Sequence, residues 1–164
     1  MRRYFVFLIF LSTLTYAQKQ KQTAKEADSV DYYIELSNFN IKTNNYKLSL
    51  TFAQKAIDYS EKTKDVKAQA FAHYTLGGIY FELKKYDDAV ETYYKSVSLY
   101  NTLKPSSEQA FCYYQLGLCF MEKGDYSLAE NYFNKAKTIY TTIRIPDAIE
   151  LLNLQKGIVY KAKG

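Results

Sequence analysis

The chain has 164 residues, enough for one domain with a hydrophobic core, and carries 22 basic and 17 acidic side chains, a net charge of +5. With 48% hydrophobic and 24% charged residues, its composition excludes a disordered chain. It has 18 Tyr and 10 Phe but only 6 Gly and 2 Pro, and so few turn formers exclude a sandwich or barrel of many short strands. The composition favours an all-α fold of long helices joined by short loops.

A basic and then apolar segment opens the chain. Two arginines precede an apolar run at residues 4–11, and the sequence turns polar after Ala17. These are the parts of a secretory signal, and the run is shorter than the ~20 apolar residues that span a bilayer. We predict a signal peptide at residues 1–17, a polar linker at 18–26 and an exported protein, periplasmic or secreted. An uncleaved N-terminal membrane anchor is the alternative.

The charge balance bears on the class of partner. Loss of the two N-terminal arginines would lower the net charge from +5 to +3, and no dense stripe of Lys and Arg follows in the sequence. A nucleic acid partner is therefore not expected. No contact with a membrane is expected beyond the export signal.

Candidates for catalysis or metal binding are few. Cys112 and Cys119 lie in one predicted helix at a separation that rises about 10 Å, too far for a disulfide between them, so we interpret both as small packing residues. The single histidine, His73, falls on a packing position, and the Asp87–Asp88 pair starts a predicted helix, where acidic residues interact favourably with the dipole. We predict no metal site, no cofactor and no enzyme activity.

The sequence repeats itself with a period of forty residues. When residues 61–100 are laid over 101–140 without a gap, identical positions recur along the whole length. They include Gln69/Gln109, Phe71/Phe111, Tyr74/Tyr114, Leu76/Leu116, Gly77/Gly117, Ala89/Ala129 and Tyr100/Tyr140. A fixed period of this length is the signature of a repeat protein.

Each unit contains two helical patterns, in which large apolar residues recur three and four positions apart. We predict helices near 27–42, 45–62, 66–83, 86–103, 105–123, 126–142 and 146–163. They form a domain at 27–163 with repeats near 27–62, 66–103 and 105–142. The terminal helix at 146–163 is interpreted either as a cap on the last hairpin or as the start of a further repeat in a truncated relative of a longer protein.

Two glycines occupy the middle of predicted helices. Gly77 and Gly117 each cost about 1 kcal/mol relative to alanine, and this cost is expected only where another helix must come close. We predict that Ala89 and Ala129, on the second helix of each hairpin, are the residues that approach them.

These residues resemble the tetratricopeptide repeat motif, in which Leu-Gly is followed by an aromatic residue, then by Ala and a second aromatic residue. The matching residues are Leu76, Gly77, Tyr80, Ala89 and Tyr93 in one unit, and Leu116, Gly117, Phe120, Ala129 and Phe133 in the next. The first unit departs from the motif, with Ser37 at the glycine position and Ser49 at the alanine position. The early Trp of the family is also absent, and the family period of about 34 residues is extended to forty here.

The resemblance implies a right-handed superhelix of helical hairpins, an α-solenoid, whose first helices line a concave groove. Expected inward positions are Asp31, Ile34, Asn38, Phe71, Tyr74, Gly78, Phe111, Tyr114 and Leu118. Of these, the candidate partner-binding residues are Asn38, Phe71, Tyr74, Phe111, Tyr114 and Leu118; packing between repeats is the alternative role for the four aromatic residues.

The resemblance also implies a function. The expectation is a non-catalytic scaffold or adaptor that binds a peptide or partner helix in its groove, and aromatic residues there suit apolar segments. The alternative is a sensory input module of a signalling protein, of the histidine kinase or transcription regulator type.

Overall fold

The computed structural model describes residues 29–163, so the predicted signal peptide and linker lie outside the described part. In that part the chain forms seven α-helices and no strand. They are α2 (Val30–Lys42), α3 (Tyr46–Thr63), α4 (Val66–Glu82), α5 (Tyr86–Tyr100), α6 (Ser107–Glu122), α7 (Tyr126–Thr142) and α8 (Pro146–Lys163). The predicted all-α helical repeat solenoid is confirmed.

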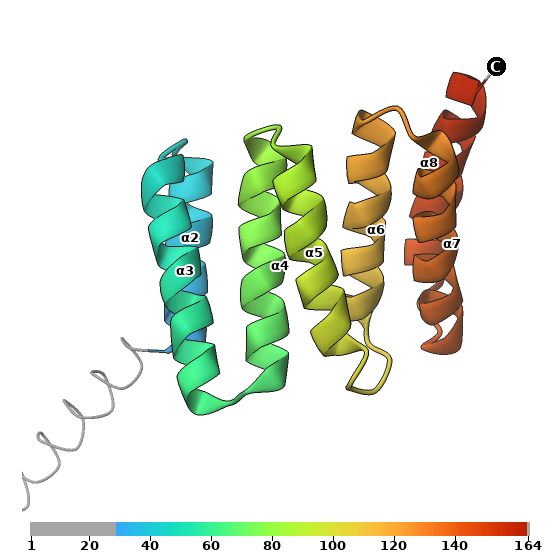
Figure 1. Cartoon of the computed structure of the whole chain (residues 1–164). Helices are drawn as coiled ribbons and strands as arrows, with labels where there is room; N and C mark the ends of the chain where they lie inside the picture. The colour runs from blue at the N-terminus through green and yellow to red at the C-terminus, as the bar shows by residue number, and fades with distance from the viewer. Residues whose placement is uncertain (1–28, 164) are drawn as a thin grey trace, which may run out of the picture.

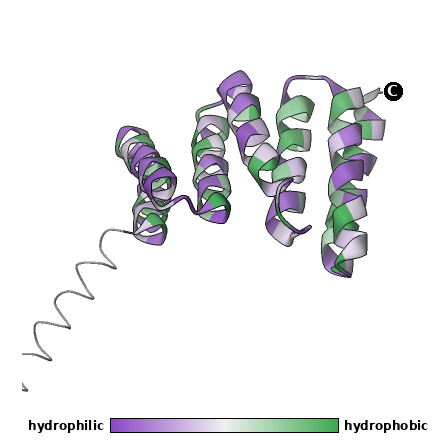
Figure 2. Ribbon diagram, turned by 60° about the horizontal axis from the view of Figure 1, so that its bottom comes forward, coloured by the Kyte–Doolittle hydropathy of each residue, from purple (hydrophilic) through white to green (hydrophobic). Residues whose placement is uncertain are grey.

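Consecutive helices form three antiparallel hairpins, α2/α3, α4/α5 and α6/α7, which stand side by side with α8 packed on the last of them (Figure 1). Each helix carries both apolar and polar residues, as helices with one buried face must (Figure 2). The first helices also contact one another, α2 with α4 and α4 with α6. The first helices thus form a continuous row through the stack. The second helices α5 and α7 meet through Tyr94 and Tyr132, whose hydroxyl oxygens lie 2.6 Å apart.

The hairpin turns follow the predicted break between helices. Gly124 adopts a φ of 78°, and the Asp125 carboxylate accepts a hydrogen bond from the Leu128 N–H at 3.1 Å, so Gly ends one helix and Asp caps the next as expected. Two predicted boundaries were wrong. Helix α5 ends at Tyr100 rather than 103, and α6 begins at Ser107 rather than 105, because Pro105 lies in the connecting loop and the Ser106 side chain caps α6.

The mid-helix glycines make room for aromatic rings of the second helix. A Cβ on Gly117 would lie 2.4 Å from Cε1 of Phe133, and one on Gly77 would lie 2.8 Å from Cδ1 of Tyr93. In each hairpin the three atoms nearest to such a Cβ belong to one aromatic ring of the second helix. The ring of Tyr93 or Phe133 thus fills the space that a side chain at the glycine position would need.

The first hairpin has serines at the two positions where the other hairpins have glycine and alanine. Ser37 and Ser49, at the positions of the glycine and the alanine, are both fully buried. The Ser37 hydroxyl donates to the Ser49 carbonyl at 3.1 Å, and the Ser49 hydroxyl donates to the Ser37 carbonyl at 2.9 Å. This reciprocal pair satisfies two buried hydroxyls and keeps α2 and α3 close.

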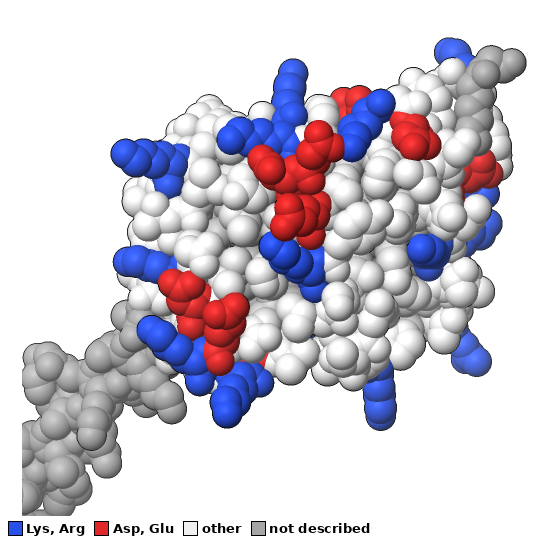
Figure 3. Space-filling model, in the orientation of Figure 1, with Lys and Arg blue, Asp and Glu red and all other residues white. Residues whose placement is uncertain are grey.

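Figure 3 shows the molecule from the same side as Figure 1. On this face acidic side chains gather over the α4/α5 hairpin, with lysines around them, and both signs of charge are interspersed (Figure 3). Helix α8 buries Leu152 and Val159 in the core and leaves Leu151, Leu154 and Ile158 exposed.

Candidate functional site

A row of aromatic rings crosses from α4 to α6. Phe71 stacks on Tyr74 with ring centroids 5.9 Å apart, and Phe111 stacks on Tyr114 at 5.6 Å. Tyr74 and Phe111 join the two pairs across the repeat boundary, 5.8 Å apart. Because each pair is three residues apart in its helix and the pairs are one repeat apart, the period of the sequence generates a continuous row.

The four rings divide between the groove and the core. Tyr74 packs on Tyr93 and Tyr114 on Phe133, each at 5.8 Å, and burial raises the pKa of Tyr74 to about 12. Phe111 remains 38% exposed. The tyrosines therefore join the core between helices. Phe71 is half-buried against the core of the first hairpins, and Phe111 reaches the surface.

A cavity of about 360 Å³ lies beside this row, where the N-terminal ends of three first helices meet. Its lining residues are Asp31 of α2, Asp65, Lys67, Ala68 and Phe71 at the start of α4, Tyr100 at the end of α5, and Glu108 of α6. A second cavity of about 50 Å³ is lined by Phe71, Tyr74, Glu108 and Phe111. Phe71 and Glu108 border both, so the aromatic row and the larger cavity form one surface.

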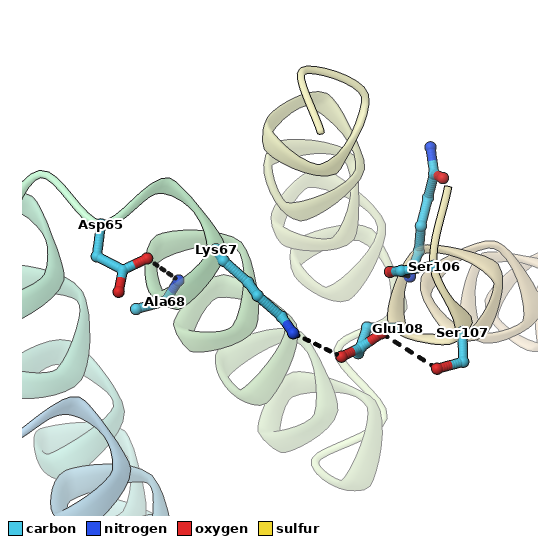
Figure 4. Close-up of polar contacts among 7 residues, drawn as sticks. Asp65, Lys67, Ala68, Ser106, Ser107 and Glu108 are labelled. Carbon is cyan, nitrogen blue, oxygen red and sulfur yellow. Dashed lines mark hydrogen bonds and ion pairs between the residues drawn. The ribbon is translucent and has the colours of Figure 1, made fainter. Parts of the chain in front are cut away.

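Polar contacts fix the rim of the larger cavity (Figure 4). Lys67 Nζ lies 3.1 Å from Glu108 Oε1, an ion pair between α4 and α6. The Asp65 carboxylate accepts the Ala68 N–H at 3.0 Å, and Ser107 Oγ donates to Glu108 Oε2 at 3.1 Å. Hydrogen bonding from its own backbone N–H, then from Lys67 and the neighbouring serines, lowers the pKa of Glu108 to about 2 despite partial burial. Glu108 therefore carries its charge at neutral pH.

The remaining predicted inward residues are dispersed. Asp31 lines the cavity, but Ile34 is only 3% exposed and belongs to the core of the first hairpins. Asn38 is exposed and borders none of the cavities described above, while Leu118 is half-buried against the core. The surface is thus concentrated between α4 and α6.

Sequence reasoning missed most of the polar rim: Asp65, Lys67, Tyr100 and Glu108. Lys67 aligns with Ser107 of the next unit, and Glu108 aligns with Ala68, so the ion pair is not repeated and leaves no periodic signal. Tyr100 does recur, as Tyr140, and this identity was the one available signal. It marked a packing position and gave no reason to expect a cavity there.

The two cysteines and the histidine that were considered as candidates for chemistry are buried or half-buried. Cys112 and Cys119 are buried free thiols, and burial raises the pKa of each to about 12. His73 is half-buried, its Nδ1 has no hydrogen-bond partner, and burial, then Lys95, lowers its pKa. Residues 29–163 hold no group of three side chains that could bind a metal, and none of their helices is both long and apolar enough to cross a membrane.

Comparison with known proteins decides the family. The sequence profile of the tetratricopeptide repeat matches residues 68–142, which hold the two units with the full motif. Residues 68–142 therefore form tetratricopeptide repeats. The predicted resemblance is confirmed, whereas a search of curated proteins found no match.

Solved structures share the solenoid. BtubC from P. vanneervenii superimposes with a TM-score of 0.74 at 20% identity, over 82% of this tetratricopeptide repeat chain and 56% of BtubC. The N-terminal domain of stress-induced protein-1 from C. elegans gives 0.61 at 20% identity, over 76% and 91%. The Rap conjugation gene regulator of plasmid pLS20, solved with its Phr* peptide, gives 0.69 at 20%, over 82% and 38%. The chain thus spans about half of BtubC and little more than a third of the Rap regulator, and the likeness is one of fold.

Proposed function

We propose that this tetratricopeptide repeat protein is a non-catalytic scaffold or adaptor that binds a peptide or partner helix on the inner side of its solenoid. The observation that carries the proposal is the continuous surface of aromatic row and cavity between α4 and α6. Partly exposed aromatic rings supply large contact area at low entropic cost, and binding surfaces are enriched in them. A similar solenoid, the Rap regulator, was solved in complex with a peptide.

The proposed cellular location of the protein rests on the predicted signal peptide. We propose that the chain is exported through the signal at residues 1–17, so that its partner is a periplasmic or secreted protein. Mass spectrometry of the exported chain tests this, because a mature N-terminus at residue 18 is expected and an intact N-terminus would contradict the cleavage.

A second candidate is an input module of a signalling protein. It is favoured by the partial coverage of a longer regulator, since this chain matches 38% of the Rap conjugation gene regulator. The downstream reading frame tests it: a transmembrane segment followed by a kinase or DNA-binding sequence would support this candidate over a free-standing scaffold.

The groove is tested by capture of partners from the exporting compartment with the purified chain as bait. The decisive variant is Phe71→Ala/Phe111→Ala, which removes two of the rings that border the cavities and leaves Tyr74 and Tyr114 in place. Phe39→Ala is the matched control, because Phe39 is 63% exposed on α2 but borders none of the cavities described here.

Partners should be retained by Phe39→Ala and lost by Phe71→Ala/Phe111→Ala, with the helical circular dichroism of both variants unchanged. A folded double variant that still captures the same partners would show that they bind elsewhere.

A further inference from the structure

The larger cavity has an unbalanced charge. Three carboxylates, from Asp31, Asp65 and Glu108, face one ammonium group, that of Lys67, which gives a net charge of −2. The ion pair at 3.1 Å engages Lys67 with Glu108, so the two aspartates are left in excess. A ligand that carries positive charge would restore the balance.

The same cavity holds an unsatisfied buried hydroxyl. Tyr100 is only 1% exposed and lines the cavity, yet its hydroxyl has no hydrogen-bond partner within the described part of the chain. Burial, then the proximity of Cys112, Glu108 and Tyr74, raises the pKa of Tyr100, so the hydroxyl stays protonated. Tyr100 lines the larger cavity together with Glu108. Buried polar groups are normally satisfied, and an exception in a cavity points to a partner supplied from outside.

We do not expect an anion to bind in the larger cavity. Helix N-termini attract anions through unpaired N–H groups, but here side chains cap all three. Ser29 accepts from the N–H of residue 32 on α2, Asp65 accepts from Ala68 on α4, and Ser106 accepts from Gln109 on α6. The caps and carboxylates together remove the positive potential that an anion would need.

The walls also suit a long side chain with an apolar stem. Ala68 and Phe71 border the cavity on the side of the aromatic row, and its volume of about 360 Å³ is near the lower end of ligand sites. Lysine and arginine bury an aliphatic stem against such surfaces while the head keeps polar contacts, and their heads also bind over aromatic faces.

We propose that this cavity binds a lysine or arginine side chain of the segment that occupies the groove. The cationic head interacts with Asp31 and Asp65 and donates to the Tyr100 hydroxyl, and the stem packs on Phe71. The partner class is therefore a peptide with a basic residue next to apolar ones. This inference rests on the proposed function, but the cavity can be tested without a known partner.

The probe is N-acetyl-arginine amide, titrated into the ¹⁵N-labelled chain and followed by amide chemical shifts. N-acetyl-glutamine amide and N-acetyl-glutamate amide are the neutral and acidic controls. Saturable shifts near Ala68 and Glu108 are expected for the arginine probe alone. Equal shifts with the glutamine or glutamate probe, or none with arginine, would overturn the proposal.

Matched variants separate the cavity from general effects. Asp31→Asn/Asp65→Asn removes two charges and keeps a capping side chain at residue 65, and Tyr100→Phe removes the unsatisfied hydroxyl. Each is expected to weaken arginine binding about tenfold. Asp125→Asn, at the cap of α7, and Tyr140→Phe, at the repeat position equivalent to Tyr100, lie outside the cavity and should leave binding unchanged. Equal weakening by these controls would refute the assignment.

The outcome also distinguishes this inference from the proposed function. Partners that depend on Phe71 and Phe111 but bind Asp31→Asn/Asp65→Asn normally would overturn the basic-residue cavity and leave the scaffold in place. Specific arginine binding without any groove-dependent partner would support the cavity and count against the scaffold.

Discussion

Gly77, Gly117 and Gly157 occupy the same repeat position. Substitution by alanine should destabilise the chain at the first two positions and stabilise it at the third. In Gly117→Ala the new Cβ would lie 2.4 Å from Cε1 and 2.5 Å from Cδ1 of Phe133, a fully buried ring that cannot move to solvent. Overpacking of this kind costs roughly 1–3 kcal/mol, against a gain of about 1 kcal/mol in helix propensity. Because the contact is far inside the normal range, we expect a net loss of about 2 kcal/mol. For Gly77→Ala, with contacts of 2.8 Å to Tyr93, a smaller loss is expected.

Gly157→Ala is the internal control. It occupies the equivalent position in α8, where a Cβ meets nothing within 4 Å, so only the propensity gain remains and the chain should be stabilised by about 0.5–1 kcal/mol. Urea denaturation followed by circular dichroism measures all three variants. A Gly117→Ala chain as stable as the wild type would refute the packing argument. The argument would also fail if Gly117→Ala cost as much stability in a Phe133→Leu background, where the residue opposite is smaller, as it does in the wild type.

Three further predictions follow from polar groups and thiols. Ser49→Ala should destabilise the chain by about 1 kcal/mol in urea denaturation, and Ser37→Ala should add less in that background than alone, because the two hydroxyls share one network. Glu108→Gln should be less stable than the wild type at pH 7, with the difference narrowing between pH 4.5 and pH 2; a carboxyl whose pKa is lowered by folding stabilises only where it is ionised. Cys112 and Cys119 should not react with a thiol reagent at pH 8 until denaturant is added, because both are buried and their pKa is raised to about 12. Fast labelling of the native chain would contradict their burial.

The period of the sequence predicted the solenoid because helix packing repeats with it. Leu116 and Ala129 are fully buried, as their place in the motif required. The reason for the glycines could not be read from the sequence, since it depends on where the ring of the second helix points. The sequence shows that Gly117 and Phe133 share a hairpin, but only the structure shows that one lies over the other.

The candidate site was predictable only in part. Its aromatic row repeats and was therefore visible, as Phe71 and Phe111. The ion pair of Lys67 with Glu108 joins two repeats through residues that do not recur, so no internal comparison reveals it. Ile34 was expected at an inward position from the resemblance to the repeat family, and the structure buries it in the core of the first hairpins.

The contacts of aromatic rings with Gly77 and Gly117 also predict the order in which parts of the chain fold. Gly77 meets Tyr93, and Gly117 meets Phe133, each within one hairpin and across a short stretch of chain. Contacts that close short loops form early and quickly. We expect the α4/α5 and α6/α7 hairpins to form as separate local units and then associate, so that changes at these rings slow folding while changes at the Lys67–Glu108 boundary mainly speed unfolding.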